Sequence, residues 1–319
     1  MVVTVAPNDD FADDSAGQVS GQISGQIAGQ ITAKGVKSAS MLRPDHVYQA
    51  MGLAEDPFKI TPDLDYLYAA DQHMETIRQL EYSAMGGSLS VLTGEVGLGK
   101  TLICRKILND FSAADDVNTA YLLNPPQNFG YLIANVIHDL TGVRTSTRAG
   151  NYHHLVELLY RVLLEEAQQG KQVVLIIDEA HRLDAEVLEG IRLLTNLETA
   201  KQKLLSIILV GQPELDDTLS RRDLRQLRQR ISVRCHLNPL NRRQTREYVN
   251  HRLVSQGTDQ GVYLTGPAHW WLYRLSGGIP RRINLLCGRA ILAAFAGFAP
   301  RVAAGHVRRA SREIEYGSD

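Results

Sequence analysis

Residues 88–101 read SLSVLTGEVGLGKT, and this stretch decides the fold of the chain. Residues 88–93 form a short apolar run, a glycine-rich turn follows, and residues 102–111 have the spacing of an amphipathic helix. Glycines let a loop approach an anion closely, so that backbone N–H groups and the N-terminus of the next helix point at its oxygens. The stretch therefore predicts a strand, a phosphate-binding loop and a helix, in that order.

The turn matches the pattern G-x-x-x-x-G-K-[S/T] in full. Its eight residues are Gly94, Glu95, Val96, Gly97, Leu98, Gly99, Lys100 and Thr101. We expect Lys100 to reach the β- and γ-phosphates of a nucleotide and the Thr101 hydroxyl to ligate Mg²⁺. The alternative, a chance glycine-rich turn before a helix, is disfavoured by the strand and the helix on either side.

A second motif, VVLIIDE at residues 173–179, supports the first independently. An apolar run that ends in a carboxylate places Asp178 at the carboxyl edge of a sheet, where ligands bind in open α/β folds. We expect Asp178 to hold Mg²⁺ and Glu179 to act as the base that polarises the attacking water. The alternative is a strand that ends in a solvated Asp-Glu pair. His181 completes the letters DEAH, which also occur in helicases, but no other helicase signature accompanies them, and we interpret it as a helix-start residue.

The pattern alternates between strands and helices on both sides of these motifs. Further strands are predicted at residues 120–123 and 204–210, and helices at 131–140, 155–167 and 185–197. Nearly continuous apolar strands between helices indicate a parallel sheet covered on both faces. From about Asn241 the strand signals stop, and helical patterns follow at residues 241–255, 267–276, 280–297 and 303–314. The sequence thus predicts an α/β domain over residues 41–240 and a small helical domain over 241–319.

Three further features carry candidate functional residues. Gln212 follows a strand predicted beside that of Asp178, so it could touch the γ-phosphate or the attacking water; a turn residue is the alternative. Residues 221–234 hold six arginines against one acid, typical of a solvated face, a nucleic-acid patch or an arginine that acts on a neighbouring subunit. Arg281 follows Pro280 at a helix start, where a cation is unusual unless a phosphate approaches; a surface arginine is the alternative.

Composition excludes several classes of protein. Hydrophobic residues make up 44% and charged residues 22%, which rules out a wholly disordered chain, a collagen and a disulfide scaffold. The net charge is −1, which weakens a nucleic-acid role without excluding a local patch. The three cysteines match no metal-ligand spacing, and no secretory signal or long apolar run occurs, so we expect a cytoplasmic protein.

The first forty residues differ from the rest. Residues 17–32 repeat a four-residue unit, GQVS GQIS GQIA GQIT, with an apolar residue every fourth position but a glycine in each unit. Because each glycine costs a helix about 1 kcal/mol, residues 1–40 are predicted to be a disordered tail, with a segment that orders on a partner as the alternative. Met41 opens the first sequence of globular character and is an alternative start.

Together these motifs resemble those of AAA+ ATPases, and more narrowly the ExeA/GspA/MshM family of bacterial ATPases for general secretion and MSHA pilus biogenesis. The resemblance covers about residues 47–313. The stretches that carry it are Asp56-Pro57-Phe58 with Thr61-Pro62-Asp63, TGEVGLGKT at 93–101, RLLTNLET at 192–199, VGQPEL at 210–215, LRQLRQRI at 224–231 and SGGIPRRINLLC at 276–287. It implies a P-loop NTPase of the AAA+ type with a helical lid domain.

The resemblance also implies roles for single residues. Lys100 and Thr101 match the Walker A pair, and Asp178 and Glu179 match Walker B. Gln212 falls at the sensor 1 position, where many AAA+ proteins have Asn, Ser or Thr. Arg230 matches the arginine finger, with Arg228 as the alternative, and Arg281 matches sensor 2. Pro57, Phe58 and Ile60 are expected near the adenine.

Two classes of function follow from the resemblance. The first is an ATPase, with ATP and Mg²⁺, that assembles or energises a bacterial secretion system or a type IV, MSHA-like pilus. Its partners would be other copies of the chain in a ring, expected to be a hexamer, and inner-membrane assembly proteins. ExeA-like chains continue into a membrane helix and a peptidoglycan-binding domain; since this sequence stops at Asp319, we expect the short MshM-like form, recruited to the inner membrane through a partner. The alternative is a DNA-associated ATPase that regulates transposition, which the near-zero net charge disfavours. A nucleotide-bound scaffold without turnover is disfavoured by Glu179 and the arginines.

Overall fold

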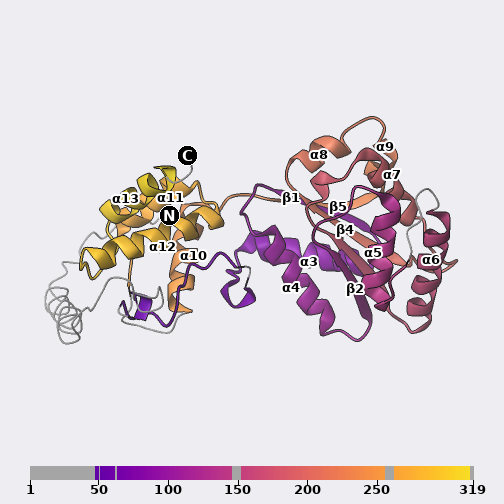
Figure 1. Ribbon diagram of the computed structural model, residues 1–319, viewed down its shortest axis with the longest axis horizontal. Coiled ribbons are helices and arrows are strands. Elements are labelled where there is room, and N and C mark those ends of the chain that lie inside the picture. The colour runs from indigo at the N-terminus through magenta and orange to yellow at the C-terminus, as the bar shows by residue number, and fades with distance from the viewer. Residues whose placement is uncertain (1–46, 50, 62, 146–151, 256–261, 317–319) are drawn as a thin grey trace, which may run out of the picture. The chain divides into compact units, whose positions relative to one another are not determined.

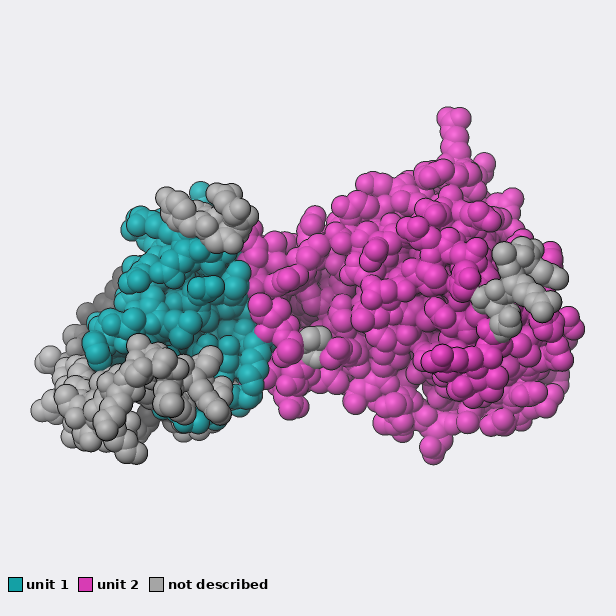
Figure 2. Space-filling model, viewed as in Figure 1, with its two compact units in different colours: residues 1–59, 245–276, 283–319 teal, residues 60–244, 277–282 magenta. Residues whose placement is uncertain are grey.

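The computed structural model describes residues 47–49, 51–61, 63–145, 152–255 and 262–316. Its contacts divide the chain into two compact units, coloured separately in Figure 2. One unit comprises Ile60–Gln244 and Gly277–Arg282, and the other comprises Met1–Lys59, Thr245–Ser276 and Ile283–Asp319. The predicted tail of residues 1–40 and its repeat lie outside the described residues, and the domain boundaries drawn along the sequence stay a prediction.

The first unit is built on a parallel sheet of five strands in the order β2-β3-β4-β1-β5 (Figure 1). The strands are β1 Leu89–Gly94, β2 Val117–Leu122, β3 Gln172–Ile177, β4 Leu205–Gly211 and β5 Ile231–Leu237. The four predicted strands and the parallel sheet are confirmed. Because all strands run the same way, the residues that follow β1, β3 and β4 meet at one edge of the sheet.

Alternate residues of the central strands face two separate cores. In β3, Val173, Leu175 and Ile177 belong to one apolar cluster, and Val174 and Ile176 belong to the other. All five side chains are fully buried. A strand buried on both faces must be apolar throughout, which explains why β3 and β4 read as continuous apolar runs.

Helices cover both faces of this sheet. The first cluster is closed mainly by α5 Phe129–Thr141, α6 His153–Gln168 and α7 Ala185–Leu194, and the second by α3 Asp71–Met85 and α4 Lys100–Ser112. Three short helices, η3 Ala180–Arg182, α8 Glu214–Leu219 and α9 Arg225–Arg230, lie in the connections after β3 and β4, and η2 Leu64–Tyr66 precedes α3. The predicted helices after β1 and β2 and on both sides of β3 are confirmed.

The helices of the C-terminal part are α10 Arg242–Val254, α11 Gly266–Ser276, α12 Pro280–Ala296 and α13 Ala304–Tyr316. Buried polar contacts hold the second unit together: the Tyr248 hydroxyl donates to Asn284 Oδ1 at 2.7 Å, and Arg252 donates to the Pro57 carbonyl oxygen at 3.0 Å. All four predicted helices are confirmed. Within the described ranges, no helix combines the length and the apolar character needed to span a membrane.

Besides the short helices, α3 and β5 of the first unit went unpredicted. Only alternate residues of β5 face the core, and its register with β1 shifts between Leu89 and Ser90. Polar residues separate the apolar residues of β5, and a run of arginines precedes the strand. The sequence pattern therefore did not indicate a strand here. The residues of β5 that point away from the core are Ser232, Arg234 and His236.

Candidate nucleotide-binding site

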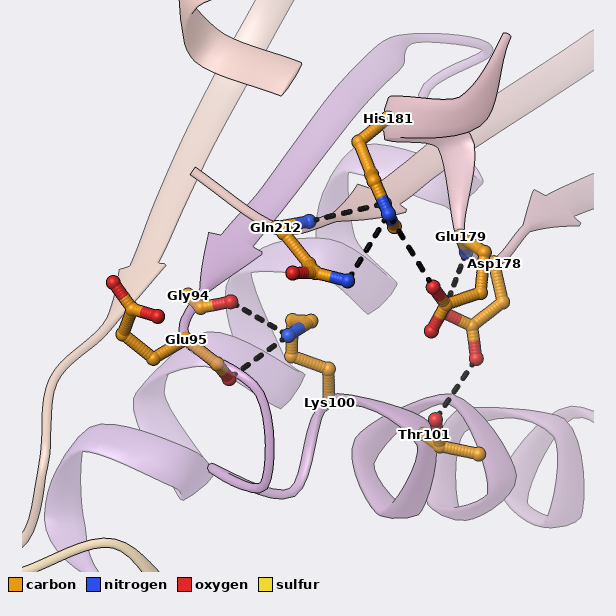
Figure 3. A network of polar contacts seen from close by, with 8 residues as sticks. All are labelled: Gly94, Glu95, Lys100, Thr101, Asp178, Glu179, His181 and Gln212. Atoms are coloured by element: carbon orange, nitrogen blue, oxygen red, sulfur yellow. Dashed lines mark hydrogen bonds and ion pairs between the residues drawn. The ribbon is translucent and has the colours of Figure 1, made fainter. Parts of the chain in front are cut away.

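The phosphate-binding loop connects the end of β1 to the start of α4. Lys100, the first residue of α4, is 7% exposed, and its Nζ donates to the carbonyl oxygens of Gly94 at 2.6 Å and Glu95 at 3.0 Å (Figure 3). Burial lowers the pKa of Lys100, while the charges of Glu179 and Asp178 act in the opposite direction. The ammonium group is thus held over the loop and beside two carboxylates, where it can meet a phosphate.

Arg281 lies against the same loop. Its backbone N–H donates to the Gly97 carbonyl oxygen at 3.2 Å. Gly97 has a φ of 85°, and a Cβ at that position would lie 2.6 Å from the Cβ of Arg281. Only glycine allows this approach, which explains the central glycine of the loop. The structure therefore brings the predicted sensor 2 residue to the predicted phosphate site.

The Gly277-Gly278-Ile279-Pro280 stretch makes that approach possible. The Leu240 N–H donates to the Gly278 carbonyl oxygen at 2.9 Å, and a Cβ at Gly278 would lie 1.9 Å from the Leu240 carbonyl oxygen. With a φ of 77°, Gly278 turns the chain where it crosses Leu240, and Pro280 then starts α12. Arg281 thus stands in the first turn of a helix, as predicted.

The candidate metal ligands meet at the end of β3. The Thr101 hydroxyl donates to Asp178 Oδ2 at 2.9 Å, and the Tyr121 hydroxyl donates to the same oxygen at 3.1 Å. Asp178 is 1% exposed. Burial, and then the charge of Asp178, raise the pKa of Tyr121, so its hydroxyl stays protonated and acts as a donor. Two hydroxyls and a buried carboxylate form one polar cluster beside α4.

These residues suit Mg²⁺ bound together with phosphates. Mg²⁺ prefers oxygen ligands and is usually held by one or two carboxylates, with waters and substrate phosphates completing its shell. Thr101 and Asp178 supply such oxygens at the N-terminus of α4. Among the described residues no group of three or more His, Cys, Asp or Glu side chains could hold a metal by itself. The donor set therefore fits a metal that arrives with a nucleotide.

Glu179 follows Asp178 in a strained turn. Its φ of 53° is rare for a residue with a side chain, and such conformations cost of order 1–3 kcal/mol. Its N–H donates to Asp178 Oδ1 at 2.9 Å, and its Oε2 lies 3.5 Å from His181 Nε2. Gln212, at the end of β4, contacts the same imidazole: its side-chain Nε2 lies 3.0 Å from His181 Nε2 (Figure 3). The predicted base and the predicted sensor 1 residue are thus joined by one histidine.

The arginines at 228 and 230 lie at the opposite edge of the sheet. Arg230 ends α9, and the next residue, Ile231, pairs with Leu89, the first residue of β1. The phosphate loop begins at the other end of this strand. Since β1 has six residues, its two ends lie about 17 Å apart at roughly 3.3 Å per residue. The exposed Arg228 and Arg230 are therefore far from the phosphate loop of their own chain.

The candidate adenine contacts fall in different units. Phe58 is buried in the unit that also holds α11, and its N–H donates to Asp56 Oδ1 at 2.8 Å. The Pro57 carbonyl oxygen accepts from Arg252, and Ile60 is an exposed residue of the sheet-containing unit. Their proximity to an adenine stays a prediction.

Sequence reasoning missed the polar contacts of His181, Tyr121 and His73. His181 was expected as a helix-start residue; it lies in the one-turn helix η3, with its ring against Glu179 and Gln212. His73 is buried, and its Nε2 lies 3.3 Å from the Leu98 carbonyl oxygen of the phosphate loop. These contacts depend on strand register or on tertiary packing, which residue spacing does not reveal. Only the letters DEAH pointed to one of the three residues, His181.

A strand, a glycine-rich loop and a helix, with an acidic pair at the end of β3, which β4 separates from β1, define a P-loop NTPase. A family model described as AAA domain matches residues 83–219. General secretion pathway protein A of Aeromonas hydrophila is 41% identical over 267 residues, which are 83% of this chain and 48% of that protein. The chain thus spans about half the length of this relative. The chain belongs to the AAA+ ATPases, and its predicted resemblance to the ExeA/GspA/MshM family is confirmed.

Solved structures support the fold assignment. Cdc6p from Pyrobaculum aerophilum matches with a TM-score of 0.62 and 16% identity, covering 78% of this chain and 70% of that chain. The ORC1 protein of Aeropyrum pernix, solved in complex with DNA, matches with a TM-score of 0.59 and 20% identity, covering 82% and 69%. At these identities the likeness shows the fold alone. Nucleotide binding and ATP hydrolysis are implied by the family to which the chain belongs, and not by these solved structures.

Proposed function

We propose that the chain binds ATP together with Mg²⁺ and hydrolyses it to ADP and phosphate, and that this ATPase serves a bacterial secretion system or a type IV, MSHA-like pilus. The observation that carries the ATPase is the contact of Thr101 with Asp178 at the N-terminus of α4, beside the buried Lys100. The observation that supports the secretion or pilus role is the 41% identity to General secretion pathway protein A.

In this proposal the residues of the loop hold the phosphates. Lys100 exchanges its two carbonyl partners in the loop for oxygens of the β- and γ-phosphates, and the N-terminus of α4 adds its dipole. Thr101 and Asp178 would hold Mg²⁺, which would supply positive charge against the negative charge that develops during phosphoryl transfer. Arg281, whose backbone lies beside Gly97, adds a further cation at the phosphate loop.

Glu179 and Gln212 act on the attacking water. Glu179 accepts its proton, and Gln212 contacts the γ-phosphate or the water from the end of β4. The carboxylate lies next to the buried Asp178, so the two groups can divide the work, one on the metal and one on the water. A further cation, an arginine finger, would stabilise the charge that develops in the transition state.

A neighbouring copy of the chain supplies that cation. Arg230 is exposed and precedes Ile231, which pairs with the start of β1, and the two ends of β1 lie about 17 Å apart. This position suits an arginine that acts on the next subunit. An arginine fits this role since it is always charged and forks onto phosphate oxygens. We therefore propose that the chain works as a ring of identical subunits, a hexamer, in the cytoplasm, recruited to the inner membrane by an assembly protein.

Phosphate release from the purified chain tests the ATPase. Turnover should require both ATP and Mg²⁺, and light scattering should show larger particles when ATP is added to the Glu179→Gln variant, which traps the nucleotide. A chain that stays monomeric at all concentrations with full activity would contradict the ring. Absence of phosphate release under assembled conditions would contradict the ATPase itself.

Partner capture tests the proposed role in secretion or pilus assembly. Tagged Glu179→Gln chain, cross-linked in its native cells and purified, should carry inner-membrane proteins of secretion or pilus assembly, whereas Lys100→Ala should lose them. Recovery of a transposase and DNA instead would contradict the secretion role and support the DNA-associated alternative. A gel-shift titration with duplex DNA gives the matching in vitro result, and we expect no shift at physiological salt.

A further inference from the structure

The imidazole of His181 lies between the two residues proposed to act on the attacking water. It sits on η3, and its side chain is 15% exposed. Its Nε2 lies 3.5 Å from Glu179 Oε2 and 3.0 Å from the side-chain nitrogen of Gln212 (Figure 3). Its Nδ1 accepts from the backbone N–H of Gln212 at 3.4 Å. Both ring nitrogens are therefore engaged by the end of β4 or by the residue after Asp178.

The backbone contact decides where the proton of a neutral imidazole lies. The Gln212 N–H can only donate, so Nδ1 acts as the acceptor and Nε2 carries the hydrogen. The amide of Gln212 then presents its oxygen to this N–H, because the two ends of an amide are told apart by their partners. The single Nε2–H faces two acceptors, the Gln212 amide oxygen and the Glu179 carboxylate.

The surrounding backbone holds the ring in this position. A Cβ at Gly211 would lie 3.2 Å from the backbone nitrogen of His181, so η3 packs directly against the end of β4. The strained turn at Glu179, with φ at 53°, fixes the start of η3 from the other side. The 3.5 Å separation between His181 and Glu179 exceeds a full N–H···O bond of about 2.9 Å. The contact can therefore shorten when Gln212 turns toward another partner.

We propose that His181 is a positioning residue that couples Gln212 to Glu179. When Gln212 turns to the γ-phosphate, the Nε2–H of His181 is left to Glu179 alone and holds its carboxylate toward the attacking water. The inference rests on the proposed function, in which Glu179 is the base. It assigns a role in hydrolysis to the histidine of the DEAH letters, which the motif alone did not indicate.

Replacements of different length test the contact. Counted in bonds from Cβ, the amide nitrogen of Gln reaches the place of Nε2, and that of Asn reaches the place of Nδ1. His181→Gln should therefore keep turnover within about threefold of the wild type, whereas His181→Asn and His181→Ala should lose about tenfold to a hundredfold in kcat, the scale of a misplaced catalytic group. The KM for ATP should stay within about twofold. His138→Asn and His138→Gln, at an exposed histidine of α5, are the controls.

A double-mutant cycle tests the link to Gln212. If His181 transmits the state of Gln212, then Gln212→Ala should cost little more in a His181→Ala background, and the double variant should lie within about twofold of the slower single variant. Independent, additive losses would overturn the coupling. Equal losses in His181→Gln and His181→Asn, or a rise in KM that accounts for the loss, would overturn the positioning role.

Glu179→Gln in the same assay separates this inference from the proposed function. If Glu179→Gln is inactive and the His181 variants do not differ from one another, the base assignment stands and only the inference is wrong. If Glu179→Gln turns over at the normal rate, the base assignment is wrong and the inference falls with it. Nucleotide affinity, measured for every variant, shows that each protein is folded.

Discussion

The two edges of the parallel sheet hold their side chains in opposite ways. At the carboxyl edge, Lys100 is 7% and Asp178 is 1% exposed, and each is held by at least two hydrogen bonds. At the amino edge, Arg225, Arg228 and Arg230 are exposed, and α9 buries only Leu227. We interpret this difference as two separate roles. The groups that bind ATP in the ground state are held in place within one chain, and an arginine that stabilises the transition state acts on a neighbouring subunit.

Loss of Lys100 should break the carboxyl edge most completely. Lys100→Ala removes the ammonium that donates to the carbonyl oxygens of Gly94 and Glu95 in the loop, and we expect no detectable ATP binding. A titration with fluorescent nucleotide measures it. Lys106→Ala is the control on the same helix, since Lys106 pairs with Asp110 at the surface and should keep wild-type affinity. An affinity of Lys100→Ala within tenfold of the wild type would contradict the role.

Loss of Arg230 should break the amino edge without touching nucleotide binding. Arginine fingers contribute about 10³–10⁵ in rate, so Arg230→Ala should lose turnover on that scale while ATP affinity stays within about threefold. Phosphate release at saturating ATP, beside the binding titration, measures both. Arg228→Ala, at an exposed position of the same helix, should be close to the wild type. The reverse result would show that Arg228, the alternative, is the arginine finger.

Glu179→Gln separates binding from chemistry within the carboxyl edge. The amide keeps the size of the carboxylate but cannot accept the proton of the water, and a general base contributes about 10²–10⁴ in rate. We expect a loss of turnover on that scale with ATP affinity unchanged. Glu214→Gln, at an exposed carboxylate of α8, is the control. Hydrolysis by Glu179→Gln at the normal rate would show that Glu179 is not the base.

Tyr121→Phe should have a smaller effect. The Tyr121 hydroxyl donates to Asp178 Oδ2, and loss of such an outer partner weakens metal binding by about tenfold. We expect the Mg²⁺ concentration for half-maximal turnover to rise by that factor. Because burial and Asp178 raise the pKa of Tyr121, its hydroxyl stays protonated, and the ratio of variant to wild type should be the same at pH 7 and pH 9. A ratio that falls to one at pH 9 would contradict a hydroxyl that stays protonated. Tyr82→Phe, at an 84% exposed tyrosine, is the control.

Much of the fold could be predicted since its central strands are buried on both faces. The apolar runs of β3 and β4 stand out against any helix pattern of similar length, and the glycine-rich turn after β1 marks where the next helix begins. The strand β5 was not predicted because three of its seven residues are polar. Its apolar residues do alternate, and a search for a period of two would have found them: Ile231, Val233, Cys235 and Leu237.

The residues of the site also fall into those that the sequence predicts and those that it does not. Lys100, Thr101, Asp178 and Glu179 follow from spacing along the chain, because loop and strand ends fix their places. Tyr121 does not, since it reaches Asp178 only through the register that pairs Tyr121 with Ile176. His181 needs the packing of η3 on β4, and Arg281 needs the crossing at Gly278 to approach Gly97. The contacts of Tyr121 and His181 therefore leave no spacing in the sequence from which to predict them, whereas Arg281 is marked by its place at a helix start.

Mixing two inactive variants tests most directly whether the two edges belong to one site. In a mixture of Arg230→Ala with Lys100→Ala, the first variant keeps an intact phosphate loop and the second lends its Arg230. We expect phosphate release well above the sum of the two separate proteins, rising with total concentration, because only neighbouring unlike subunits form a complete site. Even a minority of such pairs should be visible against a loss of about 10³–10⁵. Activity of the mixture equal to that sum, under conditions in which light scattering shows assembly, would contradict the trans-acting arginine and with it the account of the two edges.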